Sequence, residues 1–334
     1  MKILITGVHG FVGSNLVEAL KGQHTIYGLD IISPMKDGVQ KTFSWDDIEN
    51  VGSRFKVQGS SDEIPEVDAI IHLAGKAHDT KNQSAAETYF KINTELTKKI
   101  YDYYLVSPTA KKFIFFSSVK AAADRVEGEY VDENVEPKPV GPYGESKIKA
   151  EEYIFSKFRD KSLEFRDSGE RTDKKTYILR PCMIHGSGNK GNLNLLYGVV
   201  KKGIPWPLGA FENKRTFTSI DNLCFIIKGL LDKDVESGIY NINDDEAVST
   251  NELIEVICSA MGKKAHIWRI PRSLMEGCAK LGGWLHLPLN PERLQKLTEN
   301  YVSSNAKIKK ALGVEKLPVR AKEGLTKTIK SFNS

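Results

Sequence analysis

The stretch Lys2-Ile3-Leu4-Ile5-Thr6-Gly7-Val8-His9-Gly10-Phe11-Val12-Gly13 decides the fold of this chain. A short apolar run rich in β-branched residues predicts a buried strand, and three glycines follow it at intervals of three residues. Residues 14–20 then carry the apolar spacing of a helix. Strand, glycine turn and helix in this order predict an α/β protein, with a Rossmann-type doubly wound parallel sheet that binds a dinucleotide.

Each glycine has its own expected role in the turn. Gly7 permits the tight turn, Gly10 lets the backbone approach a pyrophosphate, and Gly13 lets the helix pack closely on the strand. The N-terminus of the helix then offers unpaired N–H groups and a partial positive charge to the phosphates. The next expected strand, residues 25–29, ends at Asp30, whose carboxylate can bind the ribose hydroxyls and repels a 2′-phosphate. The sequence therefore predicts NAD rather than NADP.

Two further apolar runs predict strands that end at the same edge of the sheet. Residues 68–75 finish in Leu73-Ala74-Gly75, where small side chains leave room for a cofactor lying across the sheet. Residues 112–118 finish in Ser117-Ser118 and deliver two hydroxyls to this edge. A hydroxyl at Ser118 is placed to hydrogen-bond a substrate oxygen.

Tyr143 and Lys147 are separated by one helical turn in Gly141-Pro142-Tyr143-Gly144-Glu145-Ser146-Lys147, so they share a face of the expected helix. A tyrosine that acts as a base at pH 7 needs a pKa about three units below its usual value of ~10. The lysine ammonium and a positively charged nicotinamide are the expected sources of that lowering. The pair therefore predicts a tyrosine general base.

Taken together and in this order, these motifs resemble the extended short-chain dehydrogenases/reductases of the NAD-dependent epimerase/dehydratase family, which act on nucleotide sugars. The similarity runs over nearly the whole chain. More narrowly, Ser117-Ser118-Val119-Lys120 and residues 209–215 resemble UDP-sugar 4-epimerases and 4-keto-sugar reductases of bacterial polysaccharide pathways. Further matching motifs are Asn93 in 91–94, Leu179-Arg180-Pro181, His185-Gly186-Ser187-Gly188, 215–221 and 305–313.

The resemblance implies a set of site residues. The implied catalytic residues are Ser118, Tyr143 and Lys147. Those implied to bind the cofactor are Gly7, Gly10, Phe11, Val12, Gly13, Asp30, Ile31, Leu73, Ala74, Gly75, Asn93, Ser117, Tyr143 and Lys147. Those implied to bind the nucleotide sugar are Ser118, Lys120, Asn192, Arg215 and Arg293, where arginine suits diphosphate because its planar fork binds two oxygens at once. No metal is expected, because the histidines and cysteines show no ligand spacing.

Departures from the family pattern narrow the reaction. Dehydratases of the family carry an Asp-Glu pair after the catalytic hydroxyl, where this chain has Val119 and Lys120, so 4,6-dehydration is not expected. Residues 121–123 are three alanines in place of the usual Val-Tyr-Gly, which reshapes the wall beside the sugar. Met183 replaces an asparagine of many epimerases, which puts UDP-galactose itself in doubt.

The resemblance favours a UDP-hexose 4-epimerase that works through a 4-keto intermediate, and it leaves alternatives open. A reductase of UDP-4-keto-6-deoxyhexoses would use the same residues and consume NADH or NADPH. A non-catalytic dinucleotide-binding protein is disfavoured, because Ser118, Tyr143 and Lys147 are all present. A dehydrogenase of lipophilic alcohols is disfavoured by Arg215 and by the Gly- and Asn-rich residues 186–192.

The strand–helix alternation extends to about Pro181 and predicts two domains. Residues 1–181 with about 215–247 form the expected NAD-binding domain, and residues 182–214 with 248–330 form a smaller mixed α/β lobe that binds the nucleotide sugar. Residues 84–104 are expected to be a long helix, and 215–221 a short strand and turn. The charged residues 158–175 are interpreted as an exposed, mobile insertion.

Composition agrees with a large folded enzyme. The 334 residues are 40% hydrophobic, and the net charge of +5 lies largely in the C-terminal tail, as on a solvated helix face. No nucleic-acid motif, membrane span or signal peptide is recognised. We therefore expect a cytoplasmic protein with reduced thiols and no nucleic-acid or membrane partner. Family analogy implies a homodimer that pairs the helices near 84–104 and 143–158.

Overall fold

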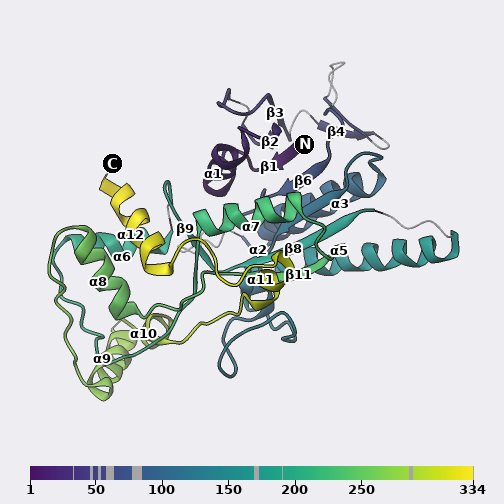
Figure 1. Ribbon diagram of the computed structural model, residues 1–334. Helices are drawn as coiled ribbons and strands as arrows, with labels where there is room; N and C mark the ends of the chain where they lie inside the picture. Colours follow the sequence, from purple (N-terminus) through teal and green to yellow (C-terminus); the bar gives the residue numbers. More distant parts are fainter. Residues whose placement is uncertain are drawn as a thin grey trace.

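A seven-stranded parallel sheet forms the centre of the protein and confirms the predicted α/β class (Figure 1). The structure is a computed structural model. It describes residues 1–32, 34–45, 48–51, 54–57, 64–76, 85–168, 173–189, 191–285 and 289–333. The strands run in the order β11-β8-β7-β6-β1-β2-β3, so the chain starts in the middle of the sheet and winds outward in both directions, as in a Rossmann fold. Their bounds are β1 Lys2–Thr6, β2 Thr25–Asp30, β3 Lys41–Ser44, β6 Ala69–His72, β7 Lys112–Phe116, β8 Lys175–Pro181 and β11 Gly238–Ile242.

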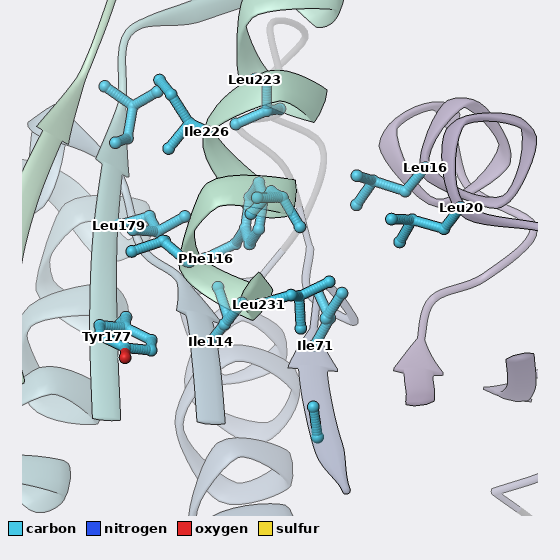
Figure 2. Close-up of a cluster of buried hydrophobic side chains, with 14 of the residues drawn as sticks. Leu16, Leu20, Ile71, Ile114, Phe116, Tyr177, Leu179, Leu223, Ile226 and Leu231 are labelled. Carbon is cyan, nitrogen blue, oxygen red and sulfur yellow. The ribbon is translucent and has the colours of Figure 1, made fainter. Parts of the chain in front are cut away.

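Helices cover both faces of this sheet, because alternate strand residues point to opposite sides. Ile3 and Ile5 of β1 face α1 (Phe11–Leu20), α7 (Ile220–Asp232) and α11 (Ala306–Leu312). Figure 2 shows this cluster, with Leu223 and Ile226 of α7 above the strand residues Phe116 and Leu179. Leu4 faces the opposite layer, made by α3 (Leu96–Val106) and α5 (Gly141–Ser168).

A third hydrophobic cluster forms the core of a helical region at one end of the molecule (Figure 1). Its helices are α6 Asn192–Lys201, α8 Thr250–Ala260, α9 Arg272–Trp284, α10 Pro291–Thr298 and α12 Ala321–Lys330. A parallel pair, β9 (Met183–His185) and β10 (Phe217–Ser219), links this region to the sheet domain. The remaining elements are the antiparallel β4 (Ile48–Val51) and β5 (Arg54–Val57), α2 (Ala86–Tyr89), α4 (Val119–Ala122) and the 3₁₀ turn η2 (Ser331–Asn333). The two-domain division stays a prediction; α11 lies within the range 248–330 yet packs on the sheet.

Three local expectations need correction. The helix expected over 84–104 consists of α2, a π-helix η1 (Phe90–Glu95) and α3, while position 84 lies outside the described residues. The range 158–175 is not simply an insertion, because α5 continues to Ser168 before the undescribed residues 169–172; its many Lys, Arg and Glu residues favour helix. The turn expected after β10 is instead the first turn of α7, which Ser219 caps by accepting the N–H of Asn222. Within the described residues, no helix is long and apolar enough to cross a membrane.

Candidate active site

The glycine turn between β1 and α1 leaves the start of the helix open. Gly7 has a φ of 71°, which only glycine adopts at low cost, and its N–H donates to the Leu29 oxygen at 2.8 Å. Gly10 is the N-cap of α1 and provides no side-chain cap. A Cβ on Gly13 would lie 2.4 Å from the Gly7 oxygen, so that position must remain glycine. The turn therefore presents main-chain N–H groups at a helix N-terminus, as a pyrophosphate site requires.

Asp30 at the end of β2 is tied directly to that turn. Its Oδ2 accepts the His9 N–H at 2.9 Å, and its Oδ1 accepts the Ile31 N–H at 2.8 Å. Parallel pairing of β1 with β2 brings the two ends together. A carboxylate is thus held beside the glycine turn, where the sequence predicts a ribose contact.

The end of β6 allows two polar side chains to approach closely. Leu73 donates its N–H to the Thr6 oxygen at 3.2 Å, and Ala74 donates to Thr6 Oγ1 at 3.0 Å. A Cβ on Gly75 would lie 3.0 Å from Asn93 Oδ1 and 3.1 Å from Lys147 Nζ. Absence of a side chain at Gly75 therefore leaves room for the lysine ammonium at the sheet edge.

Lys147 is buried on α5 and bound to the neighbouring strand. Its Nζ donates to the Phe116 oxygen, at the end of β7, at 2.8 Å. Burial lowers the pKa of this lysine to about 8, although Glu151 one turn later acts in the opposite direction. The ammonium of Lys147 is therefore easier to deprotonate than that of an exposed lysine.

Tyr143 lies one turn before Lys147 and is hydrogen-bonded to the Ser118 side chain. Burial raises the pKa of Tyr143, the Ser118 hydrogen bond lowers it, and nearby Tyr89 raises it again. The net shift is upward, so the lowering predicted from Lys147 together with a bound nicotinamide is not present in the chain alone. The reason is desolvation, which disfavours the phenolate and outweighs the hydrogen bond. The predicted grouping of Ser118, Tyr143 and Lys147 at one edge of the sheet is nevertheless what the structure contains.

Ser117 and Ser118 have different surroundings. Ser118 is the N-cap of α4, where its Oγ also accepts the Lys120 N–H at 3.2 Å. Ser117 donates a hydrogen bond to the Glu151 carboxylate. Glu151 in turn pairs with Arg180 at 2.6 Å, and both side chains are almost fully buried. Ser117 therefore connects β7 with a buried ion pair through its side chain, a contact that the sequence did not predict.

A buried series of hydrogen bonds, also missed from the sequence, joins the strands to α5. The Thr97 hydroxyl donates to the main-chain oxygen of Asn93 at 2.7 Å. Because its one proton is used there, Thr97 Oγ1 must accept from His72 Nε2 at 2.9 Å. His72 Nδ1 then accepts from Thr6 Oγ1 at 2.7 Å. Burial lowers the pKa of His72 to about 3, which agrees with this neutral tautomer. His72 thus links β1 and β6 to the π-helix.

Asn93 continues this series to α5. Its Nδ2 donates to Ser146 Oγ at 3.0 Å, and Ser146 Oγ donates to the main-chain oxygen of Tyr143 at 2.9 Å. The Asn93 Oδ1 also accepts the Lys76 N–H at 2.7 Å. Asn93 is therefore a buried bridge between the strand end and α5 rather than a solvent-facing helix residue.

The residues expected to bind the nucleotide sugar are more scattered. Lys120 lies near Ser118 and pairs with Asp124 at 2.9 Å, with its Nζ 4.6 Å from the Tyr301 ring centroid. Arg215 donates to main-chain oxygens of Lys296 and Glu299 and lies 3.7 Å from the Glu299 carboxylate. Arg293 is exposed on α10, the helix that also contains Lys296. Arg215 is therefore bound to the end of the helix that carries Arg293.

Asn192 is exposed at the first residue of α6. A joint role of Asn192, Arg215 and Arg293 in binding a diphosphate stays a prediction.

Comparison with known proteins identifies the family. The sequence profile described as the NAD dependent epimerase/dehydratase family matches residues 3–243. A UDP-glucose 4-epimerase of Vibrio cholerae is 30% identical over 345 residues, covering 99% of this chain and 95% of that protein. An N-acetyl-α-D-glucosaminyl-diphospho-ditrans,octacis-undecaprenol 4-epimerase of Escherichia coli O157:H7 is 26% identical, covering 92% and 84%. The solved structure of MoeE5 with UDP-glucuronic acid and NAD shares the fold, with a TM-score of 0.69, 18% identity and coverage of 100% and 99%.

Proposed function

The chain belongs to the NAD-dependent epimerase/dehydratase family, and on that basis we propose that it is a 4-epimerase of a UDP-linked hexose. The observation that carries this proposal is the grouping of Ser118, Tyr143 and Lys147 at the carboxyl end of β7. Such a group can move one proton to and from a sugar hydroxyl at the edge of a cofactor site. The reaction inverts C4 through a 4-keto sugar.

The residues of the sheet edge fit NAD, the cofactor of the family. The uncapped start of α1 suits the pyrophosphate, and the Asp30 carboxylate suits two ribose hydroxyls. Gly75 allows Asn93 Oδ1 and Lys147 Nζ to approach the main chain at this edge, because a Cβ there would lie 3.0 and 3.1 Å from them. When bound, NAD supplies the hydride acceptor and donor and, in its oxidised form, a positive charge that favours the tyrosine phenolate.

The protein's own residues accept and return the proton of the sugar 4-hydroxyl. Tyr143, as the phenolate, accepts the proton of the sugar 4-hydroxyl as C4 is oxidised, and returns it after the keto sugar has presented its other face. Ser118 hydrogen-bonds the same oxygen and holds it near Tyr143. Lys147, fixed to the Phe116 oxygen, contributes a positive charge that favours the phenolate against the cost of burial.

The wall beside the sugar is built from α4. Its Val119 and Lys120 stand where dehydratases carry acidic residues, and neither provides the carboxylate pair of that reaction. Lys120 with Asp124 presents a charged pair next to Ser118. This pair is the part of the site we assign to recognition of sugar substituents.

One experiment separates the epimerase from a 4-keto-sugar reductase. The purified chain is incubated with UDP-glucose, UDP-N-acetylglucosamine or UDP-glucuronic acid without added reduced cofactor, and the C4 epimers are separated by chromatography. We expect many turnovers of at least one substrate with no net absorbance change of the nicotinamide. Stoichiometric oxidation of NADH with a UDP-4-keto-6-deoxyhexose, and no epimers from any UDP-hexose, would overturn the proposal in favour of the reductase.

We also infer a cytoplasmic homodimer that pairs the helical segments 84–104 and 143–158, with 1–181 plus 215–247 as the cofactor domain and 182–214 plus 248–330 as the substrate lobe. The support is the resemblance to the family. Mass photometry of the purified chain tests the dimer, and a mass of 37.3 kDa would contradict it.

A further inference from the structure

Helix α9 buries only a narrow part of its surface. Met275, Ala279 and Gly282 are its buried residues, and they recur at i, i+4 and i+7 along one face. The rest of the helix is exposed. Because α9 is buried along one narrow face, most of its surface is available for contacts. The residue types on that exposed surface indicate what it binds.

Part of this exposed surface is apolar. Leu274, Leu281 and Leu285 recur at i, i+7 and i+11 and are 58%, 56% and 49% exposed. Trp284 on the edge of the same face is 76% exposed. Soluble surfaces carry single exposed apolar residues, whereas four large ones on one helical face mark an interaction site. We call Leu274, Leu281, Trp284 and Leu285 the α9 stripe.

Basic residues outnumber acidic ones in α9 and in the segment that leads into it. The segment 263–285 holds five lysines and arginines against the single acid Glu276, and all six are exposed. Trp268, in the segment that leads into α9, is 55% exposed. The five, which we call the basic flank, are Lys263, Lys264, Arg269, Arg272 and Lys280. Leucine, tryptophan and an excess of positive charge within a short stretch of chain are the composition of a segment that lies in the interface of an anionic membrane.

A second copy of the chain fits this surface poorly. In a two-fold dimer the same patch meets itself, so the basic flank would face another basic flank. Like charges brought together in this way oppose association. An anionic lipid surface has the complementary charge. In Figure 1, α9 lies at the end of the molecule farthest from β1–β3, where a flat surface can reach it.

We propose that the α9 stripe and the basic flank dock the protein on an anionic lipid bilayer. The helix has 13 residues, so it lies in the plane of the interface and does not span it. The proposal departs from the sequence-based expectation of no membrane partner, which addressed spanning segments. It does not depend on the proposed reaction.

Flotation with lipid vesicles tests the docking. The full chain is mixed with vesicles of phosphatidylcholine alone or with about one third phosphatidylglycerol, a fraction that places several anionic headgroups under the basic flank. We expect the protein to float with the anionic vesicles, to lose binding as salt rises, and to show a blue shift of tryptophan emission on binding. Absence of flotation at low salt, or equal flotation with both vesicles, would overturn the proposal.

Two pairs of variants locate the surface. Lys264→Glu with Lys280→Glu should weaken anionic-vesicle binding at least about twentyfold, since each basic residue near such a surface contributes about fivefold. The control Lys310→Glu with Lys316→Glu makes the same charge change on exposed tail residues and should have a much smaller effect. Equal losses in both pairs would show a general charge effect and contradict the assignment to α9.

A third pair tests the apolar contact. Leu281→Gln with Trp284→Gln should weaken binding at least about tenfold, whereas Val106→Gln with Tyr130→Gln, also exposed, should not. Thermal melting must match the wild type in each case. Tyr143→Phe should bind vesicles like the wild type, which separates this inference from the proposed reaction. Unchanged vesicle binding of the α9 pair, or its conversion of a dimer to a monomer, would assign the stripe another role.

Discussion

Lys147 donates a hydrogen bond to the main-chain oxygen of Phe116 at 2.8 Å and thereby fixes its ammonium at the carboxyl end of β7. The same burial that makes this contact possible lowers the pKa of the lysine to about 8, and the Glu151 carboxylate opposes that shift. The position and the charge of Lys147 are therefore controlled by different neighbours.

The charge of Lys147 should limit activity at alkaline pH. Because the ammonium is lost above its pKa, kcat/KM should fall as pH rises through about 8. Glu151→Gln removes the neighbour that raises this pKa, so the falling limb should move to lower pH. Glu152→Gln, the exposed next residue, is the matched control. If the pH at which kcat/KM falls is unchanged in Glu151→Gln, or shifts equally in both variants, the fall is not caused by deprotonation of Lys147.

Tyr143→Phe should reduce turnover about 10²–10⁴-fold, the usual contribution of a general base, and leave NAD affinity within about twofold. The substitution deletes one hydroxyl and almost no volume. Tyr89→Phe serves as control, because the Tyr89 ring lies edge-on to Tyr143 at 6.3 Å but is not expected to hold the proton. Steady-state rates and isothermal titration measure both effects. If Tyr143→Phe retains more than about a tenth of the wild-type rate, Tyr143 is not the general base.

Asp30 should make the protein prefer NAD to NADP, because its carboxylate repels a 2′-phosphate. Asp30→Asn keeps an acceptor for the His9 N–H and removes the charge, so it should narrow the preference chiefly by improving NADP binding. Dissociation constants at fixed salt provide the measurement. Asp37→Asn, which alters an exposed carboxylate paired with Lys21, should leave the ratio unchanged. Equal wild-type affinities for the two cofactors would refute this prediction.

Gly13→Ala should destabilise the protein by about 2 kcal/mol or more and weaken NAD binding, because the new Cβ would overlap the Gly7 oxygen and Val8 backbone. Gly22→Ala is the matched control, since a Cβ there meets no atom within 4 Å. Urea denaturation and NAD titration report the two effects. Wild-type stability in Gly13→Ala would show that the close approach of α1 to β1 is not required.

His72 should make the protein sensitive to acid. Its folded pKa of about 3 lies below the ordinary 6.5, so the unfolded chain binds the extra proton between these values and stability falls as pH decreases. Between pH 6.5 and 4 the loss attributable to His72 is about 3 kcal/mol. Urea denaturation across this range should show a slope smaller by about one proton in His72→Gln than in the wild type or the control His266→Gln. Identical slopes in all three would exclude His72 as the source.

Local spacing was enough to predict the parts of the site that lie within a few residues of one another. The glycines at 7, 10 and 13 and the pair Tyr143 and Lys147 follow from the geometry of one turn or one helix, which neighbouring residues determine. The strand ends at Asp30 and Ser118 follow from the rule that parallel strands deliver their carboxyl ends to one edge. For the same reason the fold class was predictable from the alternation of strand and helix patterns.

Tertiary structure decided the charge states of the buried groups and the contacts that hold the site residues in place. The upward pKa shift of Tyr143, the ion pair of Glu151 with Arg180 and the neutral state of His72 all depend on burial by segments distant in sequence. The π-helix around Asn93 and the binding of Arg215 to α10 likewise join residues that no local pattern relates. Spacing along a chain determines which way side chains point, but their charge depends on how much water and which partners remain around them, and that is known only once the chain has packed.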